Sequence, residues 1–257
     1  MLETNRIYNM DCVEGMRQLP DDSIDLTVTS PPYDNLRNYH GFTFDFASVA
    51  RELFRVAKPG GVVVWVVSDA TIKGSETGTS FRQALGFKEA GFNILDTMIW
   101  VKTGGGGFGS LYCYMQNTEY MFVFCKGKPK AVNLIRDHKN SHAGVKKTGH
   151  GRRFADGVTN NENGKTRIIP EFSKRNNWWY YPRSRGYEDH PATFPEELAG
   201  DHIRSWSNPG DIVLDPFLGS GTTAKMALIN GREFIGFDIS ADYCDIARRR
   251  IAEVCGT

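Results

Sequence analysis

The sequence predicts an α/β domain built on a mostly parallel sheet. In the first hundred residues, short apolar runs alternate with segments of helical periodicity, which is typical of βαβ units. The same alternation returns after residue 190, whereas the segment between is polar, basic and poor in periodicity. With 257 residues, the chain is long enough to bury the core of one large domain of this class.

Apolar runs of strand length predict the sheet. Val62–Val67 is almost purely β-branched, which predicts a central strand buried on both faces. Other strands are expected at Arg6–Asn9, Ile24–Thr29, Ile94–Val101, Tyr120–Cys125, Ile212–Leu214 and Phe234–Phe237.

Apolar residues at helical spacing predict the helices. Phe46–Ala57 has this spacing, and Pro59-Gly60-Gly61 ends the helix. Other helices are expected at Cys12–Leu19, Ser80–Ala90, Phe194–Trp206, Thr222–Asn230 and Ala241–Val254.

Charge is distributed unevenly along a chain whose net charge is only +1. Residues 126–187 hold 15 Lys and Arg against 4 Asp and Glu, and the remainder holds 16 against 26. This indicates a segment that faces a polyanion, set into an acidic body, although a solvated basic surface would look the same. We expect loops and short strands there, with the apolar residues concentrated in Trp178–Tyr181.

Composition excludes some classes of protein. The five cysteines are scattered without zinc or redox spacing, and the six histidines form no metal motif, so we expect reduced thiols and no metal. No apolar run approaches the roughly 18 residues of a membrane span, and the first residues lack the pattern of a signal peptide. We therefore expect a cytoplasmic protein with no membrane partner.

A glycine-rich turn, Asp215–Thr223, lies between a predicted strand and a predicted helix. Glycines let the backbone turn sharply and approach a ligand at the carboxyl end of the strand. The turn lacks the Lys-Ser/Thr ending of a phosphate-binding loop and the GxGxxG pattern. Asp238 ends the next strand, a position suited to the hydroxyls of a ribose. Alone, such a turn would equally suit a tight connection.

A second motif, Thr29–Tyr33 (TSPPY), directly follows a predicted strand. The two prolines stiffen the turn and lack N–H donors, so carbonyls there can accept from the amino group of a ligand. Ser30 offers another acceptor, and Tyr33 offers a face on which a base can stack. A proline turn beside a buried tyrosine is the simpler alternative for this motif alone.

Together, the two motifs resemble the cofactor motif DPFxGSGTT and the catalytic motif TSPPY of DNA amino-methyltransferases. These enzymes methylate the exocyclic nitrogen of cytosine or adenine. The similarity extends to Asp11-Cys12, Lys58–Gly61, Trp100–Lys102 and His190–Pro195. The catalytic motif precedes the cofactor motif, as in the family's beta group. The resemblance implies a Rossmann-like S-adenosylmethionine-dependent methyltransferase fold, circularly permuted, with an inserted target-recognition region.

The resemblance also implies the residues of an S-adenosylmethionine site. The methionine end is expected at the glycine-rich turn, through Asp215, Phe217, Gly219, Ser220, Gly221 and Thr222. Thr193 and Phe194 are expected to close over it. Asp238 is expected to bind the ribose, with Ile239 beside it, and Asp11 with Cys12 to bind the adenine. Met10 replaces a glycine that many members have, and Asp11 would also suit a helix N-cap.

By the same resemblance, Ser30, Pro31, Pro32 and Tyr33 are the catalytic residues. Ser30 and the Pro31 carbonyl would accept the hydrogens of the target amino group, and Tyr33 would stack on the flipped base. No cysteine follows a proline, so the nucleophile of cytosine C5 methyltransferases is absent. Serine before Pro-Pro-Tyr favours N4 of cytosine, with N6 of adenine as the alternative.

The resemblance divides the chain into a catalytic half (1–125), a basic target-recognition insert (126–187) and a cofactor-binding half (188–257). The partner is then double-stranded DNA, in a bacterial, archaeal or phage-encoded system, and a homodimer is compatible with these features. The arginines expected to contact DNA are Arg152, Arg153, Arg183 and Arg185. Trp178–Tyr181 suits either base stacking or a small core that anchors the insert.

Two functions of other kinds compete with this interpretation. One is an amino-methyltransferase that acts on RNA or on a protein glutamine, but the dispersed basic insert favours long duplex DNA. The other is a non-catalytic DNA-binding protein on a decayed methyltransferase fold. The intact residues of both motifs argue against it.

Overall fold

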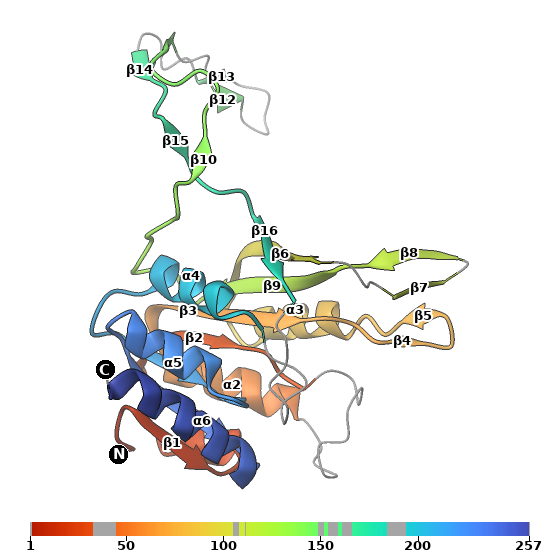
Figure 1. The fold of residues 1–257 in the computed structure, drawn as a ribbon, viewed down its shortest axis with the longest axis vertical. Helices are drawn as coiled ribbons and strands as arrows, with labels where there is room; N and C mark the ends of the chain where they lie inside the picture. The colour runs from red at the N-terminus through yellow and green to blue at the C-terminus, as the bar shows by residue number, and fades with distance from the viewer. Residues whose placement is uncertain are drawn as a thin grey trace. The chain divides into compact units, whose positions relative to one another are not determined.

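The structure is a computed structural model, and it describes residues 2–32, 45–104, 108–110, 112–148, 152–153, 159–160, 166–183 and 194–256. The chain divides into two compact units. Unit 1 comprises Met1–Asn133 and Asn177–Thr257, and unit 2 comprises Leu134–Asn176. Unit 1 contains a large sheet between two layers of helices (Figure 1).

The sheet of unit 1 has eight strands in the order β1-β18-β17-β2-β3-β9-β6-β16. Strand β9 is antiparallel to both of its neighbours, and every other neighbouring pair in this sheet is parallel. This confirms the predicted, mostly parallel sheet. Its strands are β1 (Arg6–Asn9), β2 (Ile24–Thr29), β3 (Ala57–Val67), β6 (Asn93–Thr103), β9 (Thr118–Cys125), β16 (Trp178–Pro182), β17 (Ile212–Asp215) and β18 (Glu233–Asp238).

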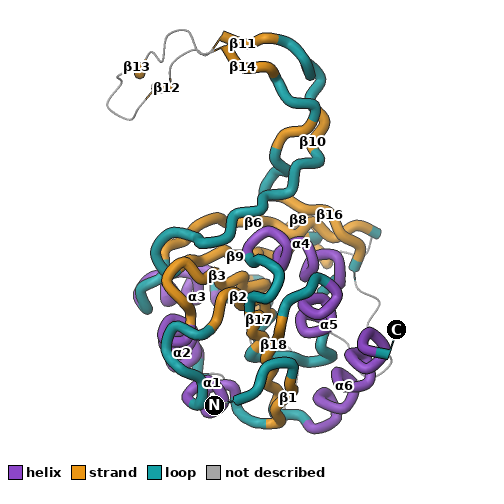
Figure 2. Tube along the Cα trace, turned by 90° about the vertical axis from the view of Figure 1, so that its left-hand side faces the viewer, coloured by secondary structure: helices purple, strands orange, loops and turns teal. Residues whose placement is uncertain are grey.

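Helices cover both faces of the sheet (Figure 2). One face carries α1 (Cys12–Arg17), α2 (Phe46–Val56) and α3 (Thr79–Glu89). The other carries α4 (Glu196–Trp206), α5 (Thr222–Ile229) and α6 (Ala241–Cys255). The last helix, α6, lies against the first strand, where Arg248 Nη2 donates to the Ile7 carbonyl over 3.4 Å. This proximity of the two ends is what a circularly permuted sheet requires.

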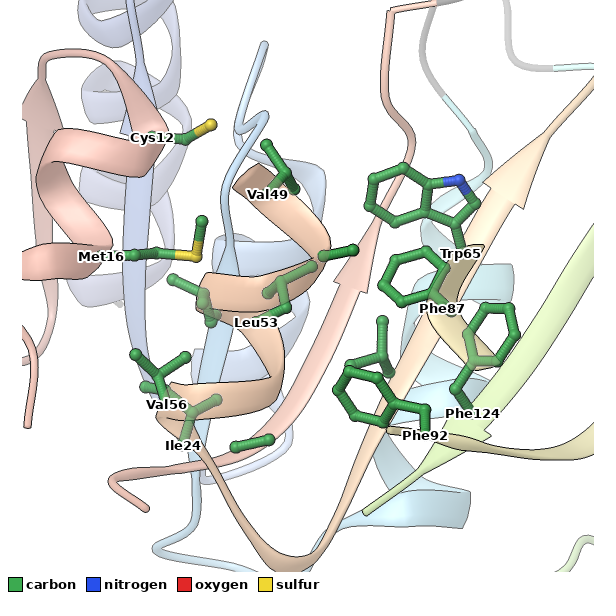
Figure 3. Close-up of a cluster of buried hydrophobic side chains, with 14 of the residues drawn as sticks. Cys12, Met16, Ile24, Val49, Leu53, Val56, Trp65, Phe87, Phe92 and Phe124 are labelled. Carbon is green, nitrogen blue, oxygen red and sulfur yellow. The ribbon is translucent and has the colours of Figure 1, made fainter. Parts of the chain in front are cut away.

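A cluster of aromatic side chains fixes the central strands (Figure 3). The rings of Trp65 and Phe87 have centroids 4.9 Å apart, and those of Phe87 and Phe124 are 4.4 Å apart. Leu53 and Val56 from α2 belong to the same buried cluster. Each such aromatic pair contributes about 0.5–1.5 kcal/mol beyond its buried area. The core therefore holds β3 and its neighbours firmly in place. Among the described helices, none has the length and apolar content of a membrane span.

The edge strand β16 is the clearest difference from the prediction. We expected only loops and short strands in this region, but Trp178–Pro182 pairs in parallel with β6 and belongs to unit 1. Trp179 and Tyr181 are buried, with the Trp179 ring 4.5 Å from His202. Trp178 and Tyr180 are exposed. Two of the four aromatic residues are thus core residues, in keeping with the anchoring interpretation.

Short strand pairs outside the main sheet escaped prediction. In unit 1, β4 (Thr71–Ile72) pairs with β5 (Ser75–Glu76), and β7 (Phe108–Ser110) pairs with β8 (Cys113–Gln116). Strands of two to four residues are too short to show a period.

Unit 2 is built from short antiparallel pairs. These are β10 (His138–Lys139) with β15 (Phe172–Ser173), β11 (Lys146–Thr148) with β14 (Thr166–Ile168), and β12 (Arg152–Arg153) with β13 (Thr159–Asn160). Arg175 Nε donates to Asp137 Oδ2 over 2.8 Å near the base of this unit. Its sequence holds ten Lys and Arg against four Asp and Glu, so much of the basic character of the predicted insert lies here.

Two helical glycines test how tightly the layers pack. A Cβ at Gly15 in α1 would lie 2.4 Å from the ring of Phe237, which is fully buried. Gly15→Ala should therefore lower the free energy of unfolding by about 1–3 kcal/mol, although alanine is the better helix former. Urea unfolding measures this loss.

Gly200→Ala in α4 is the matched control. Its Cβ would meet the flexible end of Met226 at 2.8 Å, which can move aside. We expect no loss, or a gain of up to about 1 kcal/mol from helix propensity. Equal losses in both variants would contradict the packing described for α1.

Candidate functional site

Four neighbouring parallel strands end at one edge of the sheet, and predicted site residues lie at their ends. Strand β17 ends at Asp215, β2 at Thr29 and β18 at Asp238. Strand β1 ends two residues before Asp11. The direction of winding reverses between β17 and β2, because β17 leads to β18 on one side and β2 leads to β3 on the other. Open α/β sheets bind their ligands at such a switch point.

A hydrogen bond joins the two strands at the switch point. Thr29 Oγ1 donates to Asp215 Oδ1 over 2.6 Å, and both side chains are buried. The N–H of Phe217 donates to the same oxygen over 3.1 Å. Burial raises the pKa of Asp215 to about 6, and these two bonds limit the rise because they stabilise the carboxylate. The pair thus ties the turn after β17 to the end of β2.

The glycine-rich turn is held by the acid at the end of the next strand. Gly219 and Gly221 have positive φ angles of 50° and 80°, which favour glycine. The N–H of Gly219 donates to Asp238 Oδ2 over 2.8 Å, and the N–H of Ser240 donates to Oδ1 over 2.8 Å. Each carboxylate oxygen has a further lone pair for a ligand. Burial raises the pKa of Asp238.

Asp11 and Cys12 lie at the start of α1. Asp11 Oδ1 accepts from the N–H groups of Val13 and Glu14 over 2.8 and 3.1 Å, so the N-cap interpretation is confirmed. Both bonds use Oδ1, so the cap occupies one of the two carboxylate oxygens. Burial raises the pKa of Cys12 to about 12, which keeps the thiol protonated.

The catalytic motif directly follows β2. Ser30 and Pro32 are half-buried and Pro31 is buried. Three predicted site residues, Tyr33, Thr193 and Arg185, lie outside the described residues.

Two apolar residues flank the strand ends. Phe217 packs edge-on against Trp65, with centroids 6.0 Å apart, and Ile239 is 37% exposed beside Asp238. Phe194 is half-buried two residues before α4. Among the described residues, no group of three or more His, Cys, Asp and Glu could hold a metal ion.

The arrangement suits an organic ligand with a ribose and a positive charge. The carboxylates of Asp215, Asp238 and Asp11 follow successive strand ends, and Asp238 stands where a ribose diol binds in open α/β sheets. Residues 24–249 match the family model for DNA methylases. The chain belongs to the DNA methylase family.

Relatives of this methylase cover nearly its whole length. The orphan methyltransferase M.BamHII of Bacillus amyloliquefaciens is 55% identical over 240 residues, covering 90% of this chain and 89% of that protein. The DNA adenine methyltransferase YhdJ of Escherichia coli (strain K12) is 28% identical over 278 residues, covering 97% and 83%.

Solved structures share the fold of the methylase. The cytosine-N4-specific PvuII DNA methyltransferase has a TM-score of 0.69 and 22% identity, with 97% of this chain and 87% of that chain covered. A DNA modification methylase of Thermus thermophilus, complexed with S-adenosyl-L-methionine, has a TM-score of 0.64 and 27% identity, covering 96% and 93%.

Two predicted cofactor residues of the methylase are bonded within the protein. Arg250 Nη1 donates to Ser220 Oγ over 2.7 Å and to Thr222 Oγ1 over 3.3 Å. Ser220 and Thr222 are both buried. No sequence signal pointed to Arg250, because it lies 30 residues after Ser220 and outside any motif. Thr29 was also not assigned a role, although it begins the TSPPY motif.

The predicted DNA-contacting arginines belong to different units of the methylase. Arg183 follows β16, so it lies at the same edge of the sheet as Ser30, and its Nη2 donates to Asn117 Oδ1 over 2.9 Å. Arg152 and Arg153 form β12 in unit 2, opposite Asn160 and Thr159.

The bond between Thr29 and Asp215 makes a pH-dependent prediction. Thr29→Val should cost about 1–3 kcal/mol of unfolding free energy at pH 8, where the bond is made to a carboxylate. Because the folded pKa of Asp215 is raised to about 6, the acid is mostly protonated at pH 5 and the bond is weaker there. Urea unfolding at both pH values should show the larger loss at pH 8. An equal loss at both would mean that Asp215 is not ionised through this range.

Proposed function

We propose that this DNA methylase transfers a methyl group from S-adenosylmethionine to N4 of cytosine at specific sites in duplex DNA. The observation that carries the proposal is the meeting of two motifs at adjacent strand ends. Ser30–Pro32 follows β2, the turn from Asp215 follows β17, and Thr29 bonds to Asp215 between them. Transfer requires acceptors for the target amino group beside the cofactor, held in fixed alignment.

The residues fit the cofactor by their chemistry. S-adenosylmethionine, when bound, supplies an electrophilic methyl group on a positively charged sulfur. Asp238 is proposed to bind the ribose hydroxyls and Asp11 the adenine amino group, with Cys12 and Ile239 as apolar walls. The methionine end is assigned to Thr193, Phe194 and the turn comprising Asp215, Phe217, Gly219, Ser220, Gly221 and Thr222. The bonds of Ser220 and Thr222 to Arg250 leave mainly the backbone of this turn for the ligand.

Catalysis then depends on how the chain holds the target amino group. The nitrogen lone pair is delocalised into the base, so the amine is a weak nucleophile. Ser30 Oγ and the Pro31 carbonyl would accept its two hydrogens and direct the lone pair at the methyl group. Pro32 keeps this turn stiff, and Tyr33 would stack on the flipped base. Alignment and electrostatics supply the rate, without a covalent enzyme intermediate.

The choice of cytosine rests on Ser30, since serine before Pro-Pro-Tyr is typical of enzymes that act on the cytosine amino group. Adenine N6 is the second candidate, and the name of the relative YhdJ, a DNA adenine methyltransferase, favours it. Both reactions need the same acceptors, because both target an exocyclic amine.

Binding of the duplex is assigned to the basic segment 126–187, through Arg152, Arg153, Arg183 and Arg185. A DNA contact by Arg183 would compete with its bond to Asn117. Such contacts displace counterions, so affinity should fall steeply with salt. We place the reaction in the cytoplasm, since the relatives named above come from bacteria, whose DNA lies there.

Asp238 provides a test of the cofactor site. Asp238→Asn should weaken S-adenosylmethionine binding by about 1–3 kcal/mol, because a hydrogen-bond partner of the ribose is lost. Calorimetry measures the affinity.

The substitution also removes an acceptor from Gly219 or Ser240, so a ligand control is needed. The loss should be much smaller for S-adenosylhomocysteine that lacks the ribose 2′-hydroxyl than for intact S-adenosylhomocysteine. The same loss for both ligands would remove Asp238 from the ribose site.

Ser30 provides a test of the chemistry. Ser30→Ala should slow single-turnover methylation about ten- to a hundredfold, the equivalent of one hydrogen bond of about 1.5–3 kcal/mol. Cofactor affinity should hardly change. Ser23→Ala is the control, since Ser23 lies just before the same strand and its hydroxyl donates to the Pro20 carbonyl, far along the chain from the motif. Normal methylation by the Ser30 variant would contradict the catalytic assignment.

The function itself is tested by identifying the product. DNA from cells that express the protein should contain N4-methylcytosine at one recurring sequence, detected by single-molecule sequencing and by mass spectrometry of nucleosides. N6-methyladenine would replace the proposed base by the alternative. Cofactor binding without methylation of any DNA would support the non-catalytic DNA-binding protein.

A further inference from the structure

Arg250 reaches from α6 into the back of the glycine-rich turn. Its side chain is buried, with 6% exposure, and Nη1 donates to the Ser220 carbonyl over 2.6 Å and to Ser220 Oγ over 2.7 Å. It also contacts Thr222 Oγ1 at 3.3 Å. A single guanidinium therefore holds both the backbone and the side chains of the turn.

The same guanidinium binds the start of α4. Arg250 Nη2 donates to Glu196 Oε1 over 2.7 Å, and Lys225 Nζ donates to the same oxygen over 2.8 Å. Glu196 is the first residue of α4, directly after Phe194 and Pro195. Burial opposes ionisation of Glu196, but the bonds from Lys225 and Arg250 outweigh it and hold the pKa of this carboxyl below its usual range. Three helices, α4, α5 and α6, thus meet at one ionised carboxylate.

Close packing fixes the turn against α6 as well. Gly221 has a φ angle of 80°, and a Cβ there would lie 2.8 Å from the Cβ of Ala247. Ala247 is one helical turn before Arg250, so the packing contact and the hydrogen bonds come from one face of α6. The turn is therefore supported from behind, on the side away from Asp238.

We propose that Arg250 is a positioning residue for S-adenosylmethionine, which it does not touch. Through Ser220 and Glu196 it joins the two segments assigned to the methionine end, the glycine-rich turn and the residues before α4. These segments then hold their binding geometry before the cofactor arrives, which lowers the entropic cost of binding. The planar guanidinium suits this role because it donates in several fixed directions, whereas a lysine ammonium does not. The proposal rests on the cofactor site proposed above.

The first test separates binding from chemistry. Arg250→Lys should raise the KM for S-adenosylmethionine about tenfold, equivalent to the loss of about one hydrogen bond, while kcat at saturating cofactor stays nearly unchanged. Affinity for duplex DNA without cofactor should not change. Arg249→Lys is the control, since Arg249 is the exposed neighbour on the same helix and should leave all three values normal. A folded Arg250→Lys protein with unchanged KM for the cofactor would overturn the proposal.

The second test measures preorganisation directly. Hydrogen exchange at the amides of Gly219 to Thr222, without cofactor, should be faster in Arg250→Lys than in the wild type, while amides in the central strand β3 exchange equally slowly. Acceleration at β3 as well would indicate general destabilisation and contradict a local role.

Glu196→Gln keeps the proposal testable if the arginine variant does not fold. Glutamine retains an acceptor but loses the charge, so the KM for the cofactor should rise severalfold, and less than with Arg250→Lys. The double variant should show less than the product of the two single effects, because both remove one interaction. Effects that multiply fully, or an unchanged KM in Glu196→Gln, would overturn the link between the two segments.

The wild-type protein separates this proposal from the proposed function. If it binds no S-adenosylmethionine, the proposed function fails, and the role of Arg250 fails with it. If the wild type binds and methylates while the variants bind equally well, only the role of Arg250 fails.

Discussion

The site depends on one buried hydrogen bond, from Thr29 to Asp215 across the switch point of the sheet. Thr29 ends the strand that precedes Ser30, and Asp215 ends the strand that begins the glycine-rich turn. Because neither side chain is exposed, the bond is shielded from competition by water. It fixes the distance between the group that would receive the methyl and the turn that would hold its donor.

Circular permutation explains why distant parts of the sequence share this site. The catalytic motif comes early and the cofactor motif late, yet β2 and β17 are neighbours in the sheet. The last helix packs on the first strand through Arg248, and one turn of the same helix supports Ser220 through Arg250. The aromatic core around Trp65 holds β3 beside them, so the strand ends form a rigid base for the turns.

The sequence was sufficient where local pattern and motif agree. The β-branched run Val62–Val67 became a fully buried central strand, and the glycines of Asp215–Thr223 adopt the positive φ angles that the turn needs. It was insufficient where partners are distant or where the pattern is masked by composition. In Trp178–Tyr181 all four residues are aromatic, so the alternation of exposed and buried side chains in β16 could not be seen. Arg250 looks like a surface arginine until the fold brings it to Ser220.

The central claim is that Thr29 and Asp215 act together to align transfer, and a double-mutant cycle tests it most directly. Thr29→Val, Asp215→Asn and the double variant should be compared in single-turnover methylation at saturating S-adenosylmethionine. If one bond carries the alignment, the double variant should be little slower than the slower single variant. Rates that fall by the full product of the two single effects would show that the residues act independently, and would contradict this account.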